Sequence, residues 1–295
     1  MILNASGCLD ALTAPGVARS LDAFVTKTVT PRPRAGNPPT RIAETDAGML
    51  NSIGLQNPGI DRFCADVLPR LRELGVPLWV SVGGFAAADY AELCARLDGE
   101  PGIAALELNV SCPNVASPVD ATEEIVRAAR AVTAKPLYTK LSPSAPDVAA
   151  AAEAAAAAGT DGLSVVNTLR GLALDERTLR PVVATGTGGY SGPALRPVAL
   201  AAVFACYRAT GLPIVGMGGV ETGRHALDLI AAGASAVALG TVLFRDPSAP
   251  GRIRAELAAE AAARGFADPL AARGVAHAES AAPLPGSTKT PAKTR

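Results

Sequence analysis

The sequence predicts an α/β protein that forms a single (β/α)8 TIM barrel with a long active-site loop, and three observations lead there. Short apolar runs alternate with Ala-, Leu- and Arg-rich helical stretches over roughly 250 residues, which is the size and rhythm of eight β–α units. The runs are continuously apolar, as in parallel strands buried on both faces. Polar residues recur where these runs end. A doubly wound sheet would carry an early G-x-G-x-x-G turn, and neither glycine cluster (186–189, 216–219) has that spacing.

The strands are expected, in order, at Ile2–Asn4, Phe24–Thr28, Leu78–Val82, Ala105–Val110, Leu137–Leu141, Gly162–Asn167, Ile214–Met217 and Ala236–Leu239. The helices are expected at Arg62–Leu74, Ala87–Leu97, Thr122–Val132, Asp147–Ala158, Pro197–Thr210, Gly223–Ala232 and Arg252–Arg264. The segment Pro31–Asn57 is rich in Pro, Gly and Asn without a clear helix, so we expect a functional loop there. Residues 1–280 should form the barrel domain. Residues 281–295, a polar Pro- and Lys-containing stretch, should be a disordered tail.

Composition excludes several classes of protein. With 295 residues, 49% hydrophobic and 18% charged, the chain is no disulfide miniprotein, collagen or disordered polypeptide. Equal numbers of basic and acidic residues, 27 each, give no support to nucleic-acid or membrane binding. The five cysteines form no CxxC pair, so neither a zinc site nor a disulfide frame is indicated. Without a secretory signal or an apolar run of membrane-spanning length, we expect a cytoplasmic protein.

The polar residues at the strand ends form the candidate site. Lys27, Asn109, Lys140 and the pair Asn167-Thr168 each close a predicted strand. In a barrel of parallel strands, all these ends meet at one face, where barrel active sites lie.

Glycines close the last two predicted strands. Gly218-Gly219 and Gly240-Thr241 lie ahead of predicted helices, where backbone N–H groups can bind a phosphate. Ordinary turn glycines are the alternative for either pair alone, but two such turns at the end of a barrel favour a phosphate-bearing ligand.

Cys112 lies directly after a predicted strand, between Ser111 and Pro113. A thiol there can serve as a base once its thiolate is favoured. The other cysteines are interpreted as small buried hydrophobes. His225 and His277 are interpreted as surface residues. No hydrolase elbow, zincin or P-loop motif is present, and no metal site is expected.

Several segments, in order, resemble dihydroorotate dehydrogenase. They are Ala5-Ser6-Gly7, Thr26-Lys27-Thr28-Val29-Thr30, Pro33-Arg34-Ala35-Gly36-Asn37-Pro38, Asn51-Ser52-Ile53-Gly54-Leu55-Gln56-Asn57-Pro58-Gly59, Asn109-Val110-Ser111-Cys112-Pro113-Asn114, Thr139-Lys140-Leu141-Ser142-Pro143, Asn167-Thr168, Gly188-Gly189-Tyr190-Ser191-Gly192-Pro193, Gly216-Met217-Gly218-Gly219 and Gly233-Ala234-Ser235-Ala236. The sequences of these segments are similar to those of class 1, subclass B, the NAD-linked branch of the family.

The resemblance implies FMN-dependent oxidation of (S)-dihydroorotate to orotate in UMP biosynthesis. It implies that Cys112 removes the C5 proton while the C6 hydride passes to N5 of FMN. Lys140 would lie at the N1/C2=O edge of the flavin, and Lys27 would contact flavin and substrate.

The implied binding residues fall into two sets. The substrate set is Lys27, Asn51, Ile53, Gly54, Leu55, Asn109, Asn114, Asn167 and Thr168. The FMN set is Ala5, Ser6, Gly7, Lys27, Asn109, Lys140, Val166, Gly192, Gly218, Gly219, Gly240 and Thr241. Independently of the family, a planar diamide ring suits asparagine, whose amide is both donor and acceptor.

The resemblance also implies partners. It implies a homodimer and a second subunit that carries FAD and a [2Fe–2S] cluster, together a heterotetramer. The cysteines of this chain lack ferredoxin spacing, so the cluster is expected in the other subunit. NAD is the favoured electron acceptor, with fumarate or a quinone as alternatives.

Three departures from the family pattern are visible. The chain starts close to Ala5, where relatives carry a preceding strand pair. The loop after Asn114 is short, and Tyr190 stands where Leu is common. A dihydrouracil- or dihydrothymine-oxidising relative and a non-catalytic FMN-binding barrel therefore stay open as alternatives.

Overall fold

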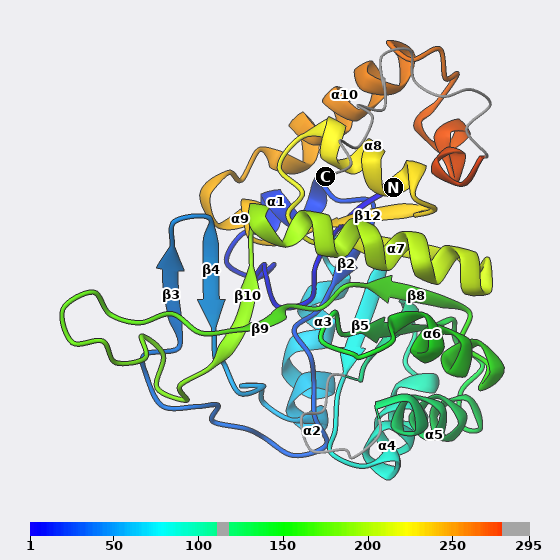
Figure 1. Cartoon of the computed structure of the whole chain (residues 1–295). Helices are drawn as coiled ribbons and strands as arrows, with labels where there is room; N and C mark the ends of the chain where they lie inside the picture. The colour runs from blue at the N-terminus through cyan, green and yellow to red at the C-terminus, as the bar shows by residue number, and fades with distance from the viewer. Residues whose placement is uncertain (111–117, 279–295) are drawn as a thin grey trace, which may run out of the picture.

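The computed structural model describes residues 1–110 and 118–278, and within them eight parallel strands form one sheet around a barrel (Figure 1). Its order is β1-β12-β11-β8-β7-β6-β5-β2. The bounds of these strands are β1 Ile2–Asn4, β2 Phe24–Val25, β5 Leu78–Val82, β6 Ile103–Asn109, β7 Leu137–Leu141, β8 Gly162–Val165, β11 Ile214–Met217 and β12 Ala236–Leu239. Each lies where the sequence predicts a strand, and the (β/α)8 prediction is confirmed.

The barrel closes between β1 and β2, the two ends of the sheet order. Leu3 bridges Ala23 in parallel register. The Asn4 side chain accepts a hydrogen bond from the backbone N–H of Val25 at 2.8 Å and donates to the Val25 carbonyl at 2.7 Å. Because a side-chain amide carries both a donor and an acceptor, Asn4 takes the place of backbone hydrogen bonds between β1 and the short strand β2.

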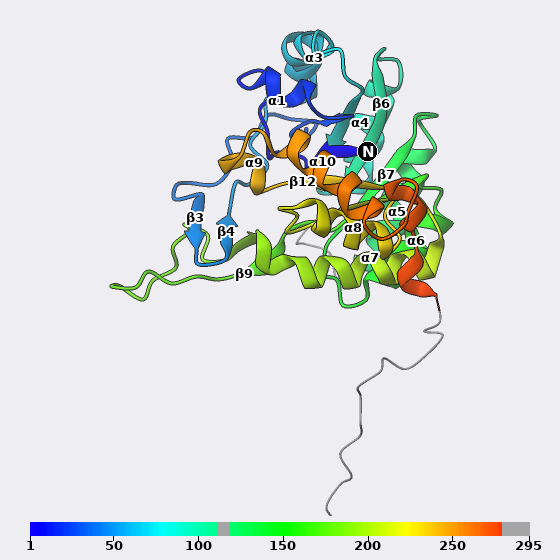
Figure 2. The same ribbon diagram turned by 90° about the horizontal axis from the view of Figure 1, so that it is seen from above.

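Helices surround the barrel (Figure 2). Their bounds are α1 Pro15–Arg19, α2 Ile60–Arg62, α3 Leu68–Arg72, α4 Ala87–Asp98, α5 Pro118–Arg130, α6 Val148–Ala157, α7 Arg196–Thr210, α8 Gly223–Ala231, α9 Val242–Arg245 and α10 Ala249–Ala262. A π-helical turn, Phe63–Val67, separates α2 from α3. Pro69 follows it, and because proline has no N–H, the regular helical ladder cannot continue unchanged through this turn. The helix expected over Thr122–Val132 begins earlier, at Pro118.

A second, antiparallel sheet stands to one side of the barrel (Figure 1). It consists of β3 Ile42–Thr45, β4 Gly48–Asn51, β10 Gly188–Ser191 and β9 Leu169–Gly171, in this order. The segment Pro31–Asn57, expected as a functional loop without a helix, contains regular structure that was not predicted, because β3 and β4 form a hairpin inside it. Its partners come from the connection after β8, more than a hundred residues away by the Tyr190↔Leu50 register.

Small and apolar side chains fill the barrel interior, chiefly Leu3, Ala23, Val25, Trp79, Ala105, Val215, Met217, Ala236 and Ala238. The larger apolar cluster lies between strands and helices. Glu107 and Ser164 are buried polar exceptions on β6 and β8. Within the described residues, no helix has both the length and the apolar character needed to span a bilayer. The tail predicted at 281–295 lies outside the described residues.

Candidate active site

Two asparagines join the ends of strands that are not neighbours. The side-chain amide of Asn167, just after β8, donates to Oδ1 of Asn109, the last residue of β6, at 3.0 Å. Asn109 in turn donates to Thr28 Oγ1 at 3.2 Å, which reaches the segment after β2. The sequence-predicted convergence of Asn109 and Asn167 at one barrel face is thus seen as a direct contact.

Lys140 lies in β7, between those two strands, and its side chain is only 4% exposed. Its ammonium donates to Ser6 Oγ at 2.9 Å and lies 3.6 Å from Glu107 Oε1. An ammonium has three protons to donate. The contact with Ser6 confirms that the segment after β1 reaches this lysine.

Lys27 and Cys8 complete the electrostatics of this mouth. Burial lowers the pKa of Lys27, and the nearby charge of Lys140 lowers it further. Burial raises the pKa of the Cys8 thiol, while Lys140 and Lys27 act in the opposite direction. The alkyl chain of Lys27 lies against Gly7, where an added Cβ would approach Lys27 Cδ to 3.1 Å. The site is therefore cationic, which suits an anionic ligand or one that gains negative charge.

The second sheet brings further polar groups to the same end. The Asn51 side chain donates to the carbonyl of Gly189 at 3.1 Å. A Cβ on Gly189 would lie 2.1 Å from Thr168 Oγ1, so Thr168 packs on the bare backbone of β10. Asn51 and Thr168, both predicted as substrate ligands, therefore lie beside the same glycine. Tyr190, the next residue, lies in register with Leu50 and Leu169 and points its hydroxyl toward Gly48.

The segment Ile53-Gly54-Leu55 presents backbone groups rather than side chains. Gly54 and Leu55 both have positive φ, 75° and 57°. Asn37 donates its backbone N–H to the Ile53 carbonyl at 3.0 Å, and the Asn57 amide donates to the Leu55 carbonyl at 2.7 Å. Two asparagines thus hold a strained turn, which is the geometry of a backbone ligand-binding loop.

A glycine cradle lies at the ends of β10 and β11. Gly192, Gly218 and Gly219 have φ of 113°, 126° and 71°, and a Cβ on Gly219 would lie 2.9 Å from both the Gly192 carbonyl and the Arg196 backbone nitrogen. Arg196 begins α7. Backbone N–H groups at a glycine turn beside a helix start are a recurrent phosphate site.

Gly240 and Thr241 adjoin the cradle. Ser191 and Thr241 hydroxyls are 3.0 Å apart, which links β10 to the end of β12. Ala5 donates its N–H to the Leu239 carbonyl at 2.7 Å, so the segment after β1 lies beside Gly240. Val166 is 3% exposed and its N–H bonds the Met217 carbonyl at 3.1 Å, which places it on the barrel wall. Phosphate cradle, buried cation and polar mouth together fit a flavin mononucleotide.

Some predicted residues are not placed. Cys112 and Asn114 lie outside the described residues. The two histidines are half-buried rather than exposed as predicted. His277 stacks on Phe204 at 3.9 Å between ring centroids, and His225 accepts from the Glu221 N–H at 3.3 Å.

Glu107 and Cys8 were missed by sequence reasoning. The sequence contains a feature that could have identified Glu107, because it is a carboxylate inside the apolar run Ile103–Asn109. No sequence feature identifies Cys8, because its proximity to Lys27 and Lys140 depends on barrel closure.

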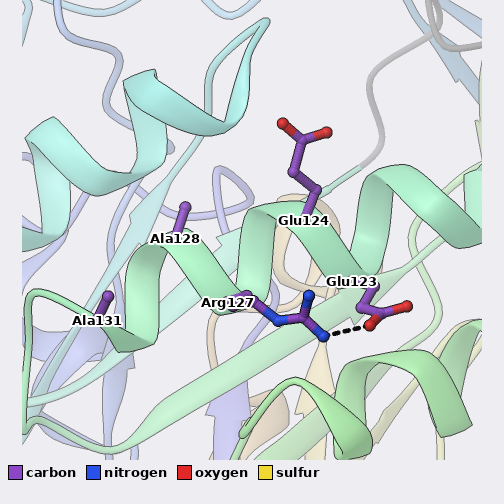
Figure 3. Close-up of a pocket in the computed structure, with 5 residues that line it drawn as sticks. All are labelled: Glu123, Glu124, Arg127, Ala128 and Ala131. Atoms are coloured by element: carbon purple, nitrogen blue, oxygen red, sulfur yellow. Dashed lines mark hydrogen bonds and ion pairs between the residues drawn. The ribbon is translucent and has the colours of Figure 1, made fainter.

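Two hollows in the described part of the chain differ in their relation to this site. One, on the exposed side of α5, is lined by Glu123, Glu124, Arg127, Ala128 and Ala131, with Glu123 paired to Arg127 (Figure 3). It contains no group from the strand ends. The other, about 300 Å³, is lined largely by apolar side chains from the segment after β1 and from the helical region that includes α3, and it reaches the site at Gly7 and Lys27.

Comparisons with known proteins agree with this geometry. Residues 1–260 match the family model of dihydroorotate dehydrogenase. The chain is 48% identical over 264 residues to "dihydroorotate dehydrogenase B (NAD(+)), catalytic subunit" of Desulforudis audaxviator (strain MP104C), which covers 87% of this chain and 86% of that protein. The protein of the same name from Geobacter sp. (strain M21) is 47% identical, with 81% and 80% covered. A crystal structure of DHODH in complex with ferulenol, from Eimeria tenella, superposes with a TM-score of 0.79 at 26% identity, covering 94% of this chain and 85% of that one. The chain belongs to the dihydroorotate dehydrogenase family.

Proposed function

We propose that this chain is the catalytic subunit of an NAD-linked dihydroorotate dehydrogenase, which oxidises (S)-dihydroorotate to orotate in UMP biosynthesis. The observation that carries the proposal is the contact of Lys140, Asn109 and Asn167 at one barrel face in a chain of this family. A buried cation beside paired amides suits the oxidation of a planar diamide ring with development of negative charge.

The asparagines hold the substrate. Asn109 and Asn167 are already bonded to each other, so their remaining donors and acceptors are fixed in direction before substrate arrives. Asn51, Asn114 and Thr168 complete the set around the ring. The backbone of Ile53, Gly54 and Leu55 closes over the substrate carboxylate, with Lys27 nearby.

FMN is the flavin we assign to this chain. When bound, it accepts the hydride from C6 of dihydroorotate. Lys140 would hold its ammonium at the N1/C2=O edge, where negative charge gathers on reduction. Ala5, Ser6, Gly7, Asn109 and Val166 would line the ring. The phosphate would lie in the cradle of Gly192, Gly218 and Gly219, beside Gly240 and Thr241.

Cys112 is the base. It follows three residues after Asn109, the end of β6. Its thiolate takes the C5 proton, and the electron pair of the C5–H bond becomes the second bond of C5=C6 as C6 gives up a hydride. The proton ends on sulfur, and the electron pair of the C6–H bond would leave with the hydride to the flavin.

A second subunit carries the electrons onward. The relatives are named catalytic subunits, which implies a partner. The family resemblance implies FAD and a [2Fe–2S] cluster in that partner, and we assign both to it, since the cysteines of this chain lack ferredoxin spacing. Two catalytic chains and two partners form a heterotetramer that reduces NAD.

Anaerobic titration of the FMN-loaded chain tests the proposal. Dihydroorotate should bleach the flavin, and dihydrouracil should not, because it lacks the carboxylate that the Ile53–Leu55 turn binds. NAD should be reduced only when the partner subunit is added. A chain that binds no FMN, or whose flavin no dihydropyrimidine reduces, would contradict the assignment. Equal bleaching by dihydrouracil would indicate a different dihydropyrimidine substrate.

A further inference from the structure

A buried carboxylate that the proposed mechanism does not use lies inside the barrel. The Glu107 side chain is 1% exposed, in β6, two residues before Asn109. Burying an ionised carboxylate is costly unless it is paired with a cation. Within the described part of the chain, Glu107 Oε1 has no hydrogen-bond partner, and its nearest cation is the Lys140 ammonium at 3.6 Å.

Strand β8, which pairs with β7 on the side opposite β6, also carries a buried polar atom without a partner. Ser164 of β8 is fully buried and lies in register with Lys140, and its hydroxyl also lacks a partner among the described residues. Two unpartnered polar atoms therefore come from the strands on either side of Lys140. Buried polar atoms without a hydrogen-bond partner are uncommon in folded proteins, so these two call for an explanation other than packing.

Four titratable groups, Lys140 included, lie around the Lys140 ammonium. They are Lys140 on β7, Glu107 on β6, Lys27 after β2 and Cys8 after β1. Two are ammonium groups and one is a thiol, so Glu107 supplies the carboxylate of the set. Ser6 fixes the Lys140 ammonium from the β1 side at 2.9 Å. The ammonium has three donors, of which Ser6 accepts one, while Glu107 lies within ion-pair distance at 3.6 Å without a hydrogen bond.

We propose that Glu107 is a positioning residue for Lys140: its carboxylate lies 3.6 Å from the buried ammonium, supplies its counter-charge and directs it at the mouth of the barrel. This inference rests on the proposed function. Without the carboxylate, the ammonium is buried beside a second lysine with no counter-ion. In a Glu107 variant, proton uptake at this site would therefore become coupled to flavin reduction.

The number of protons taken up on reduction reports this difference. Two-electron reduction with one proton changes the midpoint potential by about 30 mV per pH unit, and two protons double that slope. Wild type should show the single-proton slope. Glu107→Gln should show about twice that slope, and Glu107→Asp should return most of the way to wild type. Glu100→Gln, which removes another carboxylate paired with cations (Arg72 and Arg96), is the matched control and should keep the wild-type slope.

A double-mutant cycle tests the pair without any flavin. Urea unfolding of the FMN-free full chain is compared for wild type, Glu107→Gln, Lys140→Met and the double variant. Each single variant leaves one buried charge alone and should lower the unfolding midpoint, whereas the double variant should be more stable than the sum of the two losses predicts.

The two readouts separate the possible failures. Additive losses in urea, or a wild-type slope for Glu107→Gln, overturns the positioning role. If Glu107→Gln does not fold, the slope of Glu107→Asp against Glu100→Gln decides the same question. A chain that never takes up FMN contradicts the proposed function instead, and the urea cycle then still decides whether Glu107 and Lys140 act as a pair.

Discussion

Asn167 donates its side-chain amide to Oδ1 of Asn109 at 3.0 Å, and the bond passes over the end of the strand that carries Lys140. β6 and β8 are not neighbours, since β7 lies between them. The two amides and the lysine therefore form one rigid unit at the carboxyl ends of three consecutive strands. Pre-organised polar groups of this kind lose little freedom when a ligand binds.

Asn167→Asp should weaken substrate binding. The change replaces the N–H donor by a carboxylate oxygen, which repels both Asn109 Oδ1 and the anionic substrate. A lost buried hydrogen bond costs about 1–3 kcal/mol, so the KM for dihydroorotate should rise about 10- to 100-fold. Steady-state kinetics measures it, with FMN occupancy as the control. An unchanged KM would remove Asn167 from the substrate site.

Gly240→Ala should separate cofactor binding from folding. A Cβ there meets only Cys8 Sγ and Ala5 Cβ, at 3.7 and 3.8 Å, so the protein itself tolerates it. We expect a normal unfolding midpoint and an FMN dissociation constant raised about tenfold, or about 1.4 kcal/mol, because the methyl group fills cofactor space. Gly219→Ala should instead destabilise the protein, since its φ is 71° and a Cβ would lie 2.8 Å from Arg196 Cβ.

Gly251→Ala is the matched control for the glycine series. Gly251 lies within α10 and a Cβ there meets nothing within 4 Å. Replacing an unstrained helical glycine should stabilise the chain by about 0.4–1 kcal/mol. Its FMN affinity should equal that of wild type. A similar loss of affinity in Gly251→Ala and Gly240→Ala would mean that the cradle is not the cofactor site.

Cys94 and Cys206 should be inert in the native protein. Burial raises the pKa of each to about 12, from the ordinary value of 9.0. The native thiols keep their protons in this interval while the unfolded chain loses them, so these two residues lower stability as pH rises above 9.0. Iodoacetamide at mildly alkaline pH, followed by peptide mass spectrometry, should label Cys112 and spare both. Early labelling of Cys94 or Cys206 would contradict their burial.

Lys27→Met should stabilise the FMN-free chain at neutral pH. Burial and Lys140 lower the native pKa of Lys27, so the unfolded state binds more protons between the native and unfolded pKa values. The loss of stability caused by Lys27 is full below its native pKa and disappears as pH rises toward the ordinary lysine value of 10.5. The gain in urea midpoint should therefore shrink with rising pH. Lys135→Met, whose ammonium donates to the Glu100 carbonyl at 3.2 Å, should show no such pH-dependent gain.

The barrel could be predicted from the sequence because each parallel strand is a local apolar run. The run Leu78–Val82, for example, is buried along its whole length and matches β5 at both ends. The antiparallel sheet could not be predicted, since Ile42–Thr45 is largely exposed and Gly188–Ser191 is glycine-rich. Such segments become strands only through pairing with distant parts of the chain.

The same division holds within the site. Asn109, Lys140 and Asn167 could be predicted together, because strand ends in a closed barrel meet at one face. The pairing of Lys140 with Ser6 could not, because it depends on how the segment after β1 folds back across the mouth. Glu107 was hidden by its place in an apolar strand, where side-chain direction decides whether a carboxylate meets a cation.

Anaerobic rapid-mixing of dihydroorotate with FMN-loaded wild type and Cys112→Ser tests the central claim most directly. Both proteins should bind FMN, and the wild-type flavin should be bleached rapidly. Bleaching in Cys112→Ser should be slower by about 10²-fold or more, because a general base typically contributes that much. Bleaching of the serine variant at nearly the wild-type rate, or no bleaching of wild type, would contradict it.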